Sequence, residues 1–354
     1  MDQLIERVPL RLIVFGFVLL FTLWLGKKLL PALYKFKCDQ PISGYLEEHK
    51  AKAGTPTMGG LFFAIPTLVA VLLVTLTVLK TDAPVQTVTS LAGILFLSLA
   101  NAGIGLWDDV LKIQKRKAAI ARGETEIHNE GLKVIPKLLL QFAASTLTVA
   151  FLALTGSIQT VMHVPFTSGV VDLGFWYYVI SVILIVGFVN AVNLTDGIDG
   201  LASVMGLVCM AFLFFVGQKA GQLGLECSGL ALGAGLTGFL AYNWHPAKVF
   251  MGDTGSLFIG AVLGGAAVLS GFLIEFLMLG LLFWLDMGTS VLQVAVYKLT
   301  KKQLPDGTYE GKRLFKKAPV HHLLQEIGWS EETVVLVFAL GTFLLGLAAY
   351  FGIG

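Results

Sequence analysis

Long apolar runs alternate with short polar stretches from one end of the chain to the other. A run of about 20 apolar residues can cross a bilayer as a helix, so each run predicts one membrane span. The eighth and ninth runs are continuous, and we divide them at Glu275 because a single helix of that length would overshoot the bilayer. The ten predicted spans are 9–30, 58–79, 88–107, 135–154, 173–192, 201–217, 227–243, 255–274, 276–297 and 332–352.

Helical spans suit lipid because a helix satisfies its backbone hydrogen bonds internally. The strands of a membrane barrel would alternate with a period of two residues, and these runs do not. The predicted fold class is therefore all-α, a polytopic membrane protein with ten transmembrane helices. Residues 1–354 are predicted to form a single integral membrane domain.

Lysine and arginine gather in the loops after the first, third and ninth spans, which share one side of the membrane when ten helices are counted. Short basic loops stay in the cytoplasm, so this side is predicted to be cytoplasmic and both termini to lie outside. The outer loop 155–172 alternates weakly around Pro165 and Gly169, which predicts a short β-hairpin on the periplasmic side. His163 in this loop is expected to be incidental.

The composition excludes several classes of protein. Hydrophobic residues make up 56% of the chain and charged residues only 14%, which leaves too little polar surface for a soluble protein. The formal net charge of +2 is too small to indicate nucleic-acid binding. The three cysteines are scattered without a CxxC spacing, so neither a disulfide framework nor a zinc site is expected.

Acidic residues collect in the loops on the cytoplasmic side. Crowded carboxylates repel one another unless a cation lies among them, and magnesium takes one or two protein carboxylates together with substrate phosphates. Lysines suit phosphate oxygens as point charges. The pattern therefore predicts an active site on the cytoplasmic face for a polyanionic, diphosphate substrate. Its acids are Asp108, Asp109, Asp196, Asp199 and Asp253, and its basic residues are Lys52, Lys112, Lys137, His321 and His322.

Each polar stretch taken alone has an ordinary structural explanation. Asp108 and Asp109 could be solvated at a helix end, and Asp253 could cap the N-terminus of the eighth span. The two histidines could be ordinary loop residues. Asp286 lies inside the ninth span, where an acid is a candidate for function, with a helix break or a buried hydrogen-bonded pair as the alternative.

Five motifs together resemble those of one known family. The chain carries GTPTMGG, DDVLK, NLTDGIDGLA, PAKVFMGDTGSL and PVHH with a following GW, which are similar to motifs of the phospho-N-acetylmuramoyl-pentapeptide transferases. These enzymes belong to the polyprenyl-phosphate N-acetylhexosamine-1-phosphate transferase superfamily. The motifs run from His49 to Trp329, so the resemblance covers most of the chain.

The resemblance implies an enzyme of peptidoglycan synthesis in the bacterial cytoplasmic membrane. Such an enzyme transfers phospho-MurNAc-pentapeptide from UDP-MurNAc-pentapeptide to undecaprenyl phosphate with Mg²⁺, forming lipid I and releasing UMP. The resemblance also implies ten helices with both ends outside, a homodimer, and inhibition by nucleoside antibiotics. A bent ninth helix in this family would place Gly288 and Thr289 near a groove for the lipid.

The resemblance also assigns roles by motif. It implies that the catalytic residues are Asp108, Asp109, Asp253, His321 and His322. The three acids are the implied metal ligands, with Asp253 the most direct. The family's third histidine is Leu323 here, so no role that needs a third imidazole is expected. Phe250 is expected to stack on uracil. The other implied substrate-binding residues are Lys52, Thr57, Lys112, Lys137, Asn193, Asp196, Gly197, Ile198, Asp199 and Asn243.

Two rival functions and two mechanisms stay open. A sister transferase would use UDP-N-acetylglucosamine, and a transporter of anionic metabolites would bind its substrate without cleaving it. A transporter would need charged sites on both sides of the midplane, whereas these motifs gather on one side. A phosphate monoester is largely dianionic at pH 7, so the acceptor needs no strong base. Asp108 could deprotonate the remaining monoanion, orient the nucleophile or, in a two-step scheme, attack first itself. We favour a single displacement.

Overall fold

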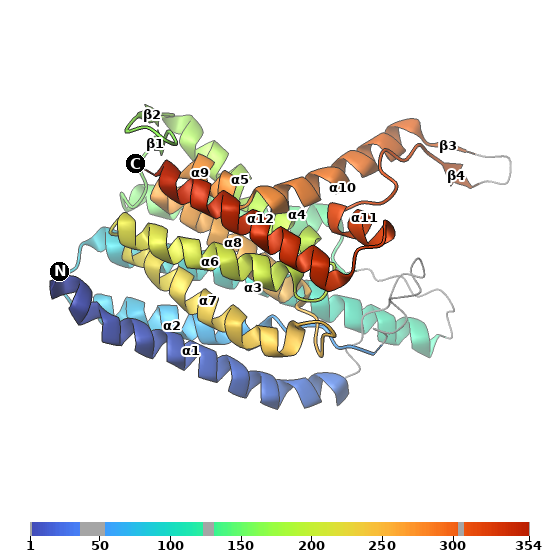
Figure 1. Ribbon diagram of the computed structural model, residues 1–354, viewed down its shortest axis with the longest axis horizontal. Coiled ribbons are helices and arrows are strands. Elements are labelled where there is room, and N and C mark those ends of the chain that lie inside the picture. The colour runs from blue at the N-terminus through green and yellow to red at the C-terminus, as the bar shows by residue number, and fades with distance from the viewer. Residues whose placement is uncertain (1, 36–53, 123–130, 304–307, 354) are drawn as a thin grey trace.

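The apolar runs fold into long helices that lie side by side along the molecule (Figure 1). The computed structural model describes residues 2–35, 54–122, 131–303 and 308–353. Four short strands form two hairpins, β1 (Val161–His163) with β2 (Val170–Asp172) and β3 (Lys302–Gln303) with β4 (Tyr309–Glu310). The helices are α1 (Asp2–Lys35), α2 (Leu61–Val78), α3 (Val85–Ala121), α4 (Val134–Leu154), α5 (Phe175–Thr195), α6 (Leu201–Lys219), α7 (Leu223–Asn243), α8 (Gly252–Ser270), α9 (Leu273–Leu279), α10 (Leu281–Thr300), α11 (Val320–Glu326) and α12 (Glu331–Gly352).

The predicted all-α polytopic fold is confirmed. In the described part of the chain, nine helices are long and apolar enough to span a membrane, and counting the bent pair α9–α10 as one span makes up to ten. The hairpin predicted in loop 155–172 is confirmed as well, because β1 and β2 pair antiparallel with Met162 opposite Val171. It lies at the end of the bundle where α1 begins and α12 ends (Figure 1). That this end faces outside stays a prediction.

Helix α3 runs beyond its predicted end. The apolar run stops at residue 107, but the helix continues to Ala121 because the polar stretch that follows contains good helix formers and no proline or glycine. Asp108 and Asp109 therefore lie within a helix, and their exposed fractions are only 2% and 0%. The alternative that these two acids are solvated at a helix end is wrong.

The continuous eighth and ninth runs break at two glycines rather than at Glu275. Gly271 follows α8 with a φ of +75°, a left-handed conformation that glycine adopts without strain. A second break at Gly280 separates α9 from α10, which are bent by 75° relative to each other. Glu275 is buried inside α9 and pairs with His163 of β1, so His163 ties the hairpin to the bundle instead of being incidental.

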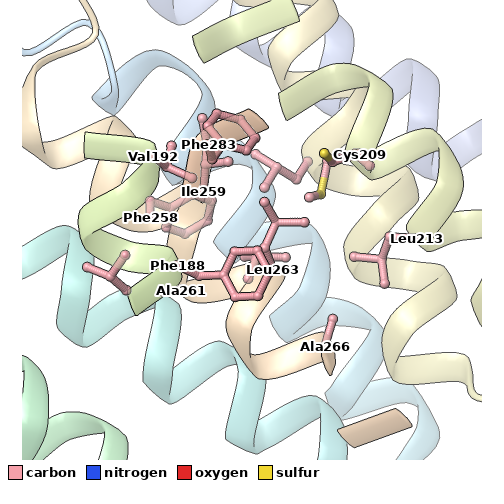
Figure 2. Packing of buried hydrophobic residues seen from close by; sticks show 14 of the residues in the cluster. Phe188, Val192, Cys209, Leu213, Phe258, Ile259, Ala261, Leu263, Ala266 and Phe283 are labelled. Atoms are coloured by element: carbon pink, nitrogen blue, oxygen red, sulfur yellow. The ribbon is translucent and has the colours of Figure 1, made fainter. Parts of the chain in front are cut away.

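Helix α8 lies at the centre of the bundle. Its apolar part is wholly buried, and Figure 2 shows Ile259 and Leu263 of α8 in the same buried cluster as Phe188 of α5. Small residues along α8 let neighbouring backbones approach closely, as is usual between membrane helices. At Gly260, for example, an added Cβ would come within 2.5 Å of the Val189 Cα. The position of α8 is therefore fixed by backbone contacts as well as by side chains.

The crossing of α3 over the first turn of α8 depends on Gly105. An added Cβ there would lie 2.3 Å from the backbone oxygen of Asp253. We expect Gly105→Ala to lower the free energy of unfolding by about 1–3 kcal/mol, because a backbone contact cannot yield as a flexible side chain would.

The matched control is Gly103→Ala, two residues earlier on the same helix. Nothing lies within 4 Å of the Cβ that alanine would add there. Alanine is also the better helix former, so the thermal midpoint of this variant should be unchanged or higher. Thermal unfolding in detergent measures both variants, and equal midpoints would contradict the close crossing at Gly105.

Candidate active site

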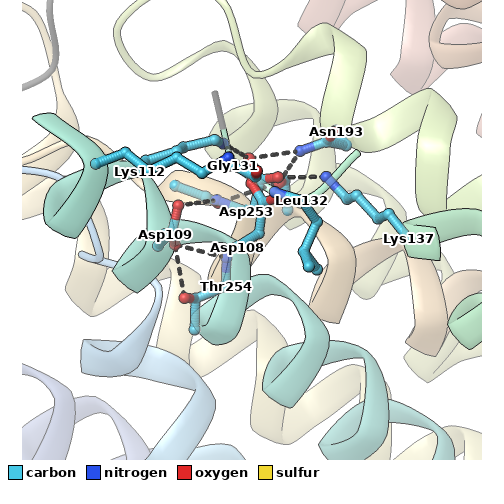
Figure 3. Close-up of polar contacts among 12 residues, drawn as sticks. Asp108, Asp109, Lys112, Gly131, Leu132, Lys137, Asn193, Asp253 and Thr254 are labelled. Carbon is cyan, nitrogen blue, oxygen red and sulfur yellow. Dashed lines mark hydrogen bonds and ion pairs between the residues drawn. The ribbon is translucent and has the colours of Figure 1, made fainter. Parts of the chain in front are cut away.

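Three predicted acids meet where α3 crosses the start of α8 (Figure 3). One carboxylate oxygen from each of Asp108, Asp109 and Asp253 lies within 4.8 Å of the other two. Asp108 and Asp109 are adjacent on α3, and Asp253 stands in the first turn of α8. The prediction from loop sidedness that these acids share one site is therefore matched by their placement, although they are 144 residues apart along the chain.

Asp109 holds the first turn of α8. Its Oδ1 accepts the backbone N–H of Asp253 at 3.1 Å, and its Oδ2 accepts the N–H and the hydroxyl of Thr254 at 3.0 and 2.7 Å. The first turn of a helix has free N–H groups and a partial positive charge, so a carboxylate there is favourable. The N-cap position itself is Met251, which has no capping side chain. Asp253 is thus not the N-cap of α8. Asp109 of α3 accepts the free N–H groups of the first turn that a capping side chain would accept.

Two lysines bracket the other two carboxylates. Lys112 Nζ lies 2.6 Å from Asp108 Oδ2 and 3.0 Å from Asp253 Oδ1. Lys137 of α4 contacts Asp253 Oδ2, and Asn193 of α5 donates to Asp253 Oδ1 at 3.2 Å. Figure 3 shows these side chains converging on Asp253 from three helices. All of them were predicted as site residues.

The donor set fits a hard divalent cation. Carboxylate oxygens are the ligands that magnesium prefers. Asp253 and the Oδ2 atom of Asp108 contact lysine ammonium groups, which a metal can displace, while Asp108 Oδ1 accepts the Leu132 N–H at 2.7 Å. Both oxygens of Asp109, in contrast, accept hydrogen bonds from α8. The described residues therefore suit a metal held chiefly by Asp253 and Asp108.

A cleft of about 770 Å³ opens beside the acids. One part of its wall is polar and includes Asp108, Lys112, Lys137, Asn193 and Asp253. Another part is apolar and comes from α4, α5 and α10, with Leu138, Leu194, Met287 and Val291. A cleft with both kinds of wall can hold a molecule that carries a charged head and an apolar tail.

The predicted nucleoside-binding stretches also come together. Phe250 N–H donates to the Pro56 carbonyl at 2.8 Å and the Phe250 carbonyl accepts from Gly59 N–H at 2.9 Å, which joins the stretch before α2 to the stretch before α8. Thr57 is 3% exposed, and its hydroxyl has no hydrogen-bond partner among the described residues. Asn243 is committed to the fold, since it accepts from the Ser203 hydroxyl at 2.6 Å and donates to the Val249 carbonyl at 3.0 Å.

The loop between α5 and α6 supplies Gly197, Ile198 and Asp199. Asp199 is buried and accepts from Ala247 N–H at 3.0 Å and from the His245 ring at 3.1 Å. These bonds fix the loop against the stretch that follows α7. His245, which directly precedes the PAKVFMGDTGSL motif, is a residue that the sequence analysis missed.

The histidine loop, which contains His321 and His322 of the PVHH motif and is helical as α11, lies against the loop between α5 and α6. An added Cβ at Gly197 would come within 2.3 Å of His321 Nε2 and 3.3 Å of His322 Nε2. His321 is fully buried within α11, so the alternative of an ordinary loop residue does not hold for it. Asp286 accepts from the His321 ring at 2.6 Å, which is the buried hydrogen-bonded pair considered above for this acid. Lys52 lies outside the described residues.

Burial raises the pKa of Asp196 to about 8, and the nearby charges of Asp253 and Asp109 add to the effect. Asp196 follows the last residue of α5 and faces the acidic cluster without an ion pair of its own among the described contacts. A carboxyl group with such a pKa is largely protonated at neutral pH until a cation reaches the site.

Comparison with known proteins agrees with this geometry. Residues 91–271 match the model of glycosyl transferase family 4, and residues 52–63 match phospho-N-acetylmuramoyl-pentapeptide-transferase signature 1. A phospho-N-acetylmuramoyl-pentapeptide-transferase from Carboxydothermus hydrogenoformans is 38% identical over 336 residues, covering 93% of this chain and 94% of that protein. The chain belongs to the phospho-N-acetylmuramoyl-pentapeptide-transferase family.

A second relative in the family shows that the similarity is not confined to the motifs. The protein of that name from Clostridium botulinum strain Alaska E43 is 34% identical over 349 residues, which covers 98% of this chain and 97% of that protein. The matched region includes every described residue of the acidic cluster and of the histidine loop.

We expect Asp109→Asn to destabilise the protein more than Asp108→Asn does. The amide would turn an NH₂ group toward the N–H donors of α8 or leave one of them unpaired. Either change should lower the free energy of unfolding by about 2 kcal/mol. In Asp108→Asn, Lys112 keeps its ion pair with Asp253, so the loss should be smaller. Thermal unfolding in detergent gives the order, and an equal or reversed order would contradict the holding role of Asp109.

The Asp196 carboxyl should make stability fall as pH rises. Its folded pKa of about 8 lies above the unfolded value near 3.8, so the folded protein binds the extra proton between these limits. We expect the thermal midpoint of Asp196→Asn to exceed that of the wild type by a margin that grows from pH 5 to pH 8 and then levels off. Measurement in EDTA, with the exposed Asp82→Asn as control, tests this; a constant margin would refute it.

Proposed function

We propose that this protein transfers phospho-MurNAc-pentapeptide from UDP-MurNAc-pentapeptide to undecaprenyl phosphate, forming lipid I and UMP in peptidoglycan synthesis. The observation that carries the proposal is the acidic cluster bracketed by Lys112 and Lys137 beside a cleft with one polar and one apolar wall. A diphosphate donor needs cations and a metal site, and a polyprenyl acceptor needs an apolar wall.

The proposal places the protein in the bacterial cytoplasmic membrane as a single domain, residues 1–354. The basic loops after the first, third and ninth predicted spans support a cytoplasmic active site with both termini outside. By family resemblance we extend the proposal to a homodimer and to inhibition by nucleoside antibiotics. These two extensions rest on the resemblance alone.

The metal in this proposal is Mg²⁺, held by Asp253 and Asp108, with Asp109 fixing Asp253 through the backbone of α8. When bound, it would neutralise charge that builds up on the diphosphate as the bond to the leaving nucleotide breaks. Lys112 and Lys137 lie on Asp253 and can move to phosphate oxygens of the donor. The chain thus contributes positioning and positive charge rather than a covalent step.

The acceptor phosphate approaches from the apolar wall of the cleft. An oxygen of the undecaprenyl phosphate forms a bond to the sugar-linked phosphorus, and the bond from that phosphorus to the UMP oxygen breaks, with the electron pair leaving on UMP. The attacking phosphate is largely dianionic at neutral pH, so no strong base is required. Asp108 at the rim of the cleft orients the nucleophile or takes its remaining proton.

The nucleoside half of the donor binds where the loop between α5 and α6 meets the stretch before α8. Phe250 stacks on uracil in this proposal, and Asn243, Gly197, Ile198 and Asp199 shape the pocket, with Lys52 beside it. Support comes from the backbone bonds that bring Phe250 to the Pro56–Gly59 stretch and from the bonds that fix Asp199. Thr57, Asn193 and Asp196 complete the site.

The first test is UMP release by the purified protein. We expect UMP release from UDP-MurNAc-pentapeptide in the presence of undecaprenyl phosphate, and we expect this release to require Mg²⁺. Release should be lost in Asp253→Asn, because this variant lacks the main metal ligand. Gly103→Ala, whose Cβ meets nothing, is the control for a folded variant of unchanged activity.

The other outcomes separate the rival functions. Release from UDP-N-acetylglucosamine but not from the muramoyl nucleotide would move the protein to the sister branch of the superfamily. Cleavage of neither donor by a folded sample would overturn the transferase proposal and favour a transporter.

A further inference from the structure

Helix α10 carries an acid that the reaction does not use directly. Most of α10 faces away from the bundle, and its buried residues are Phe283 and Asp286. The exposed fraction of Asp286 is 0%. An acid within a membrane span is costly and is usually kept for a partner or a function.

The partner of Asp286 is His321 in the histidine loop. Asp286 Oδ2 lies 2.6 Å from His321 Nδ1, and Oδ1 accepts the backbone N–H of His321 at 3.2 Å. Both side chains are fully buried. One carboxylate thus binds the ring and the backbone of the same residue, so the imidazole cannot rotate without breaking the pair. Because a carboxylate accepts, the ring proton stays on Nδ1 and Nε2 is the nitrogen left for another group.

His321 Nε2 lies against Gly197, a residue of the proposed nucleoside site. It is buried and has no hydrogen-bond partner among the described residues. An added Cβ at Gly197 would come within 2.3 Å of it, so a side chain at position 197 would cover it. A buried nitrogen without a partner is unfavourable, and a ligand that lies beside Gly197 would supply the missing bond.

We propose that Asp286 is a positioning residue that fixes the ring of His321 so that Nε2 contacts the nucleotide half of the donor. The inference rests on the proposed function for the identity of that donor. Asp286 lies in the membrane interior and in none of the polar motifs. The inference adds it to the residues that are proposed to control donor binding. Asp286 itself touches no substrate.

The test combines activity with a direct measurement of the ring. We expect Asp286→Asn to reduce kcat/KM for the nucleotide donor about 10- to 100-fold, by analogy with groups that orient metal-binding histidines. The KM for undecaprenyl phosphate should be unchanged, because neither Asp286 nor His321 lines the cleft that is proposed to hold the acceptor. In His321→Gln the same change at Asp286 should have no further effect.

Nitrogen-15 NMR of histidine-labelled protein reports the ring directly. The His321 signal, identified by its loss in His321→Gln, should show a proton on Nδ1 in the wild type and a different proton distribution in Asp286→Asn. Glu226→Gln is the matched control, since Glu226 is another buried acid in a span and pairs with Arg11 instead. It should leave donor kcat/KM and the His321 signal unchanged.

Two results would overturn the inference. An unchanged His321 signal in Asp286→Asn would show that Asp286 does not set the ring. An equal loss of activity from Asp286→Asn with and without His321→Gln would show that Asp286 supports the fold alone. The NMR measurement needs no substrate, so a failure of the proposed function would appear separately, as a wild type that is inactive on the muramoyl donor.

Discussion

The carboxylate of Asp109 is the contact on which the active site depends. Gly252 and Thr254 in the first turn of α8 are buried, so the N–H groups of this turn need partners within the protein. Asp109 satisfies two of them and a hydroxyl from across the helix crossing. Since Asp108 is its neighbour on α3 and Asp253 carries one of the bound N–H groups, this contact sets the distance between the two acids best placed to hold a metal.

Much of this arrangement could be predicted from the sequence. Apolar runs located the spans, and counting them placed the polar loops on one side, which was enough to group the acids of α3 and α8. The breaks at Gly271 and Gly280 could not be placed this way, because a run that is apolar throughout gives no signal where a helix stops. Glycine in such a run is as often a packing residue as a break, as Gly260 shows.

The different roles of the predicted site residues could not be predicted from the sequence either. Asp108 and Asp109 have the same side chain and are adjacent in the sequence. Only the crossing of α3 over α8 makes Asp109 bind the first turn of α8 and leaves Asp108 beside Lys112. The pairing of Asp286 with His321 and of Asp199 with His245 likewise joins residues 35 and 46 positions apart. Such contacts depend on how helices pack, and a single sequence does not record that.

The apolar wall of the cleft has a consequence for how the protein meets its lipid. Leu138, Leu194, Met287 and Val291 come from helices that span the membrane, so the lipid would arrive and depart sideways within the bilayer. The effective concentration that governs such an encounter is the mole fraction of the lipid in the membrane, not its amount in the suspension. Diluting the bilayer with inert lipid would thus slow turnover even when the total amounts of enzyme and lipid are constant.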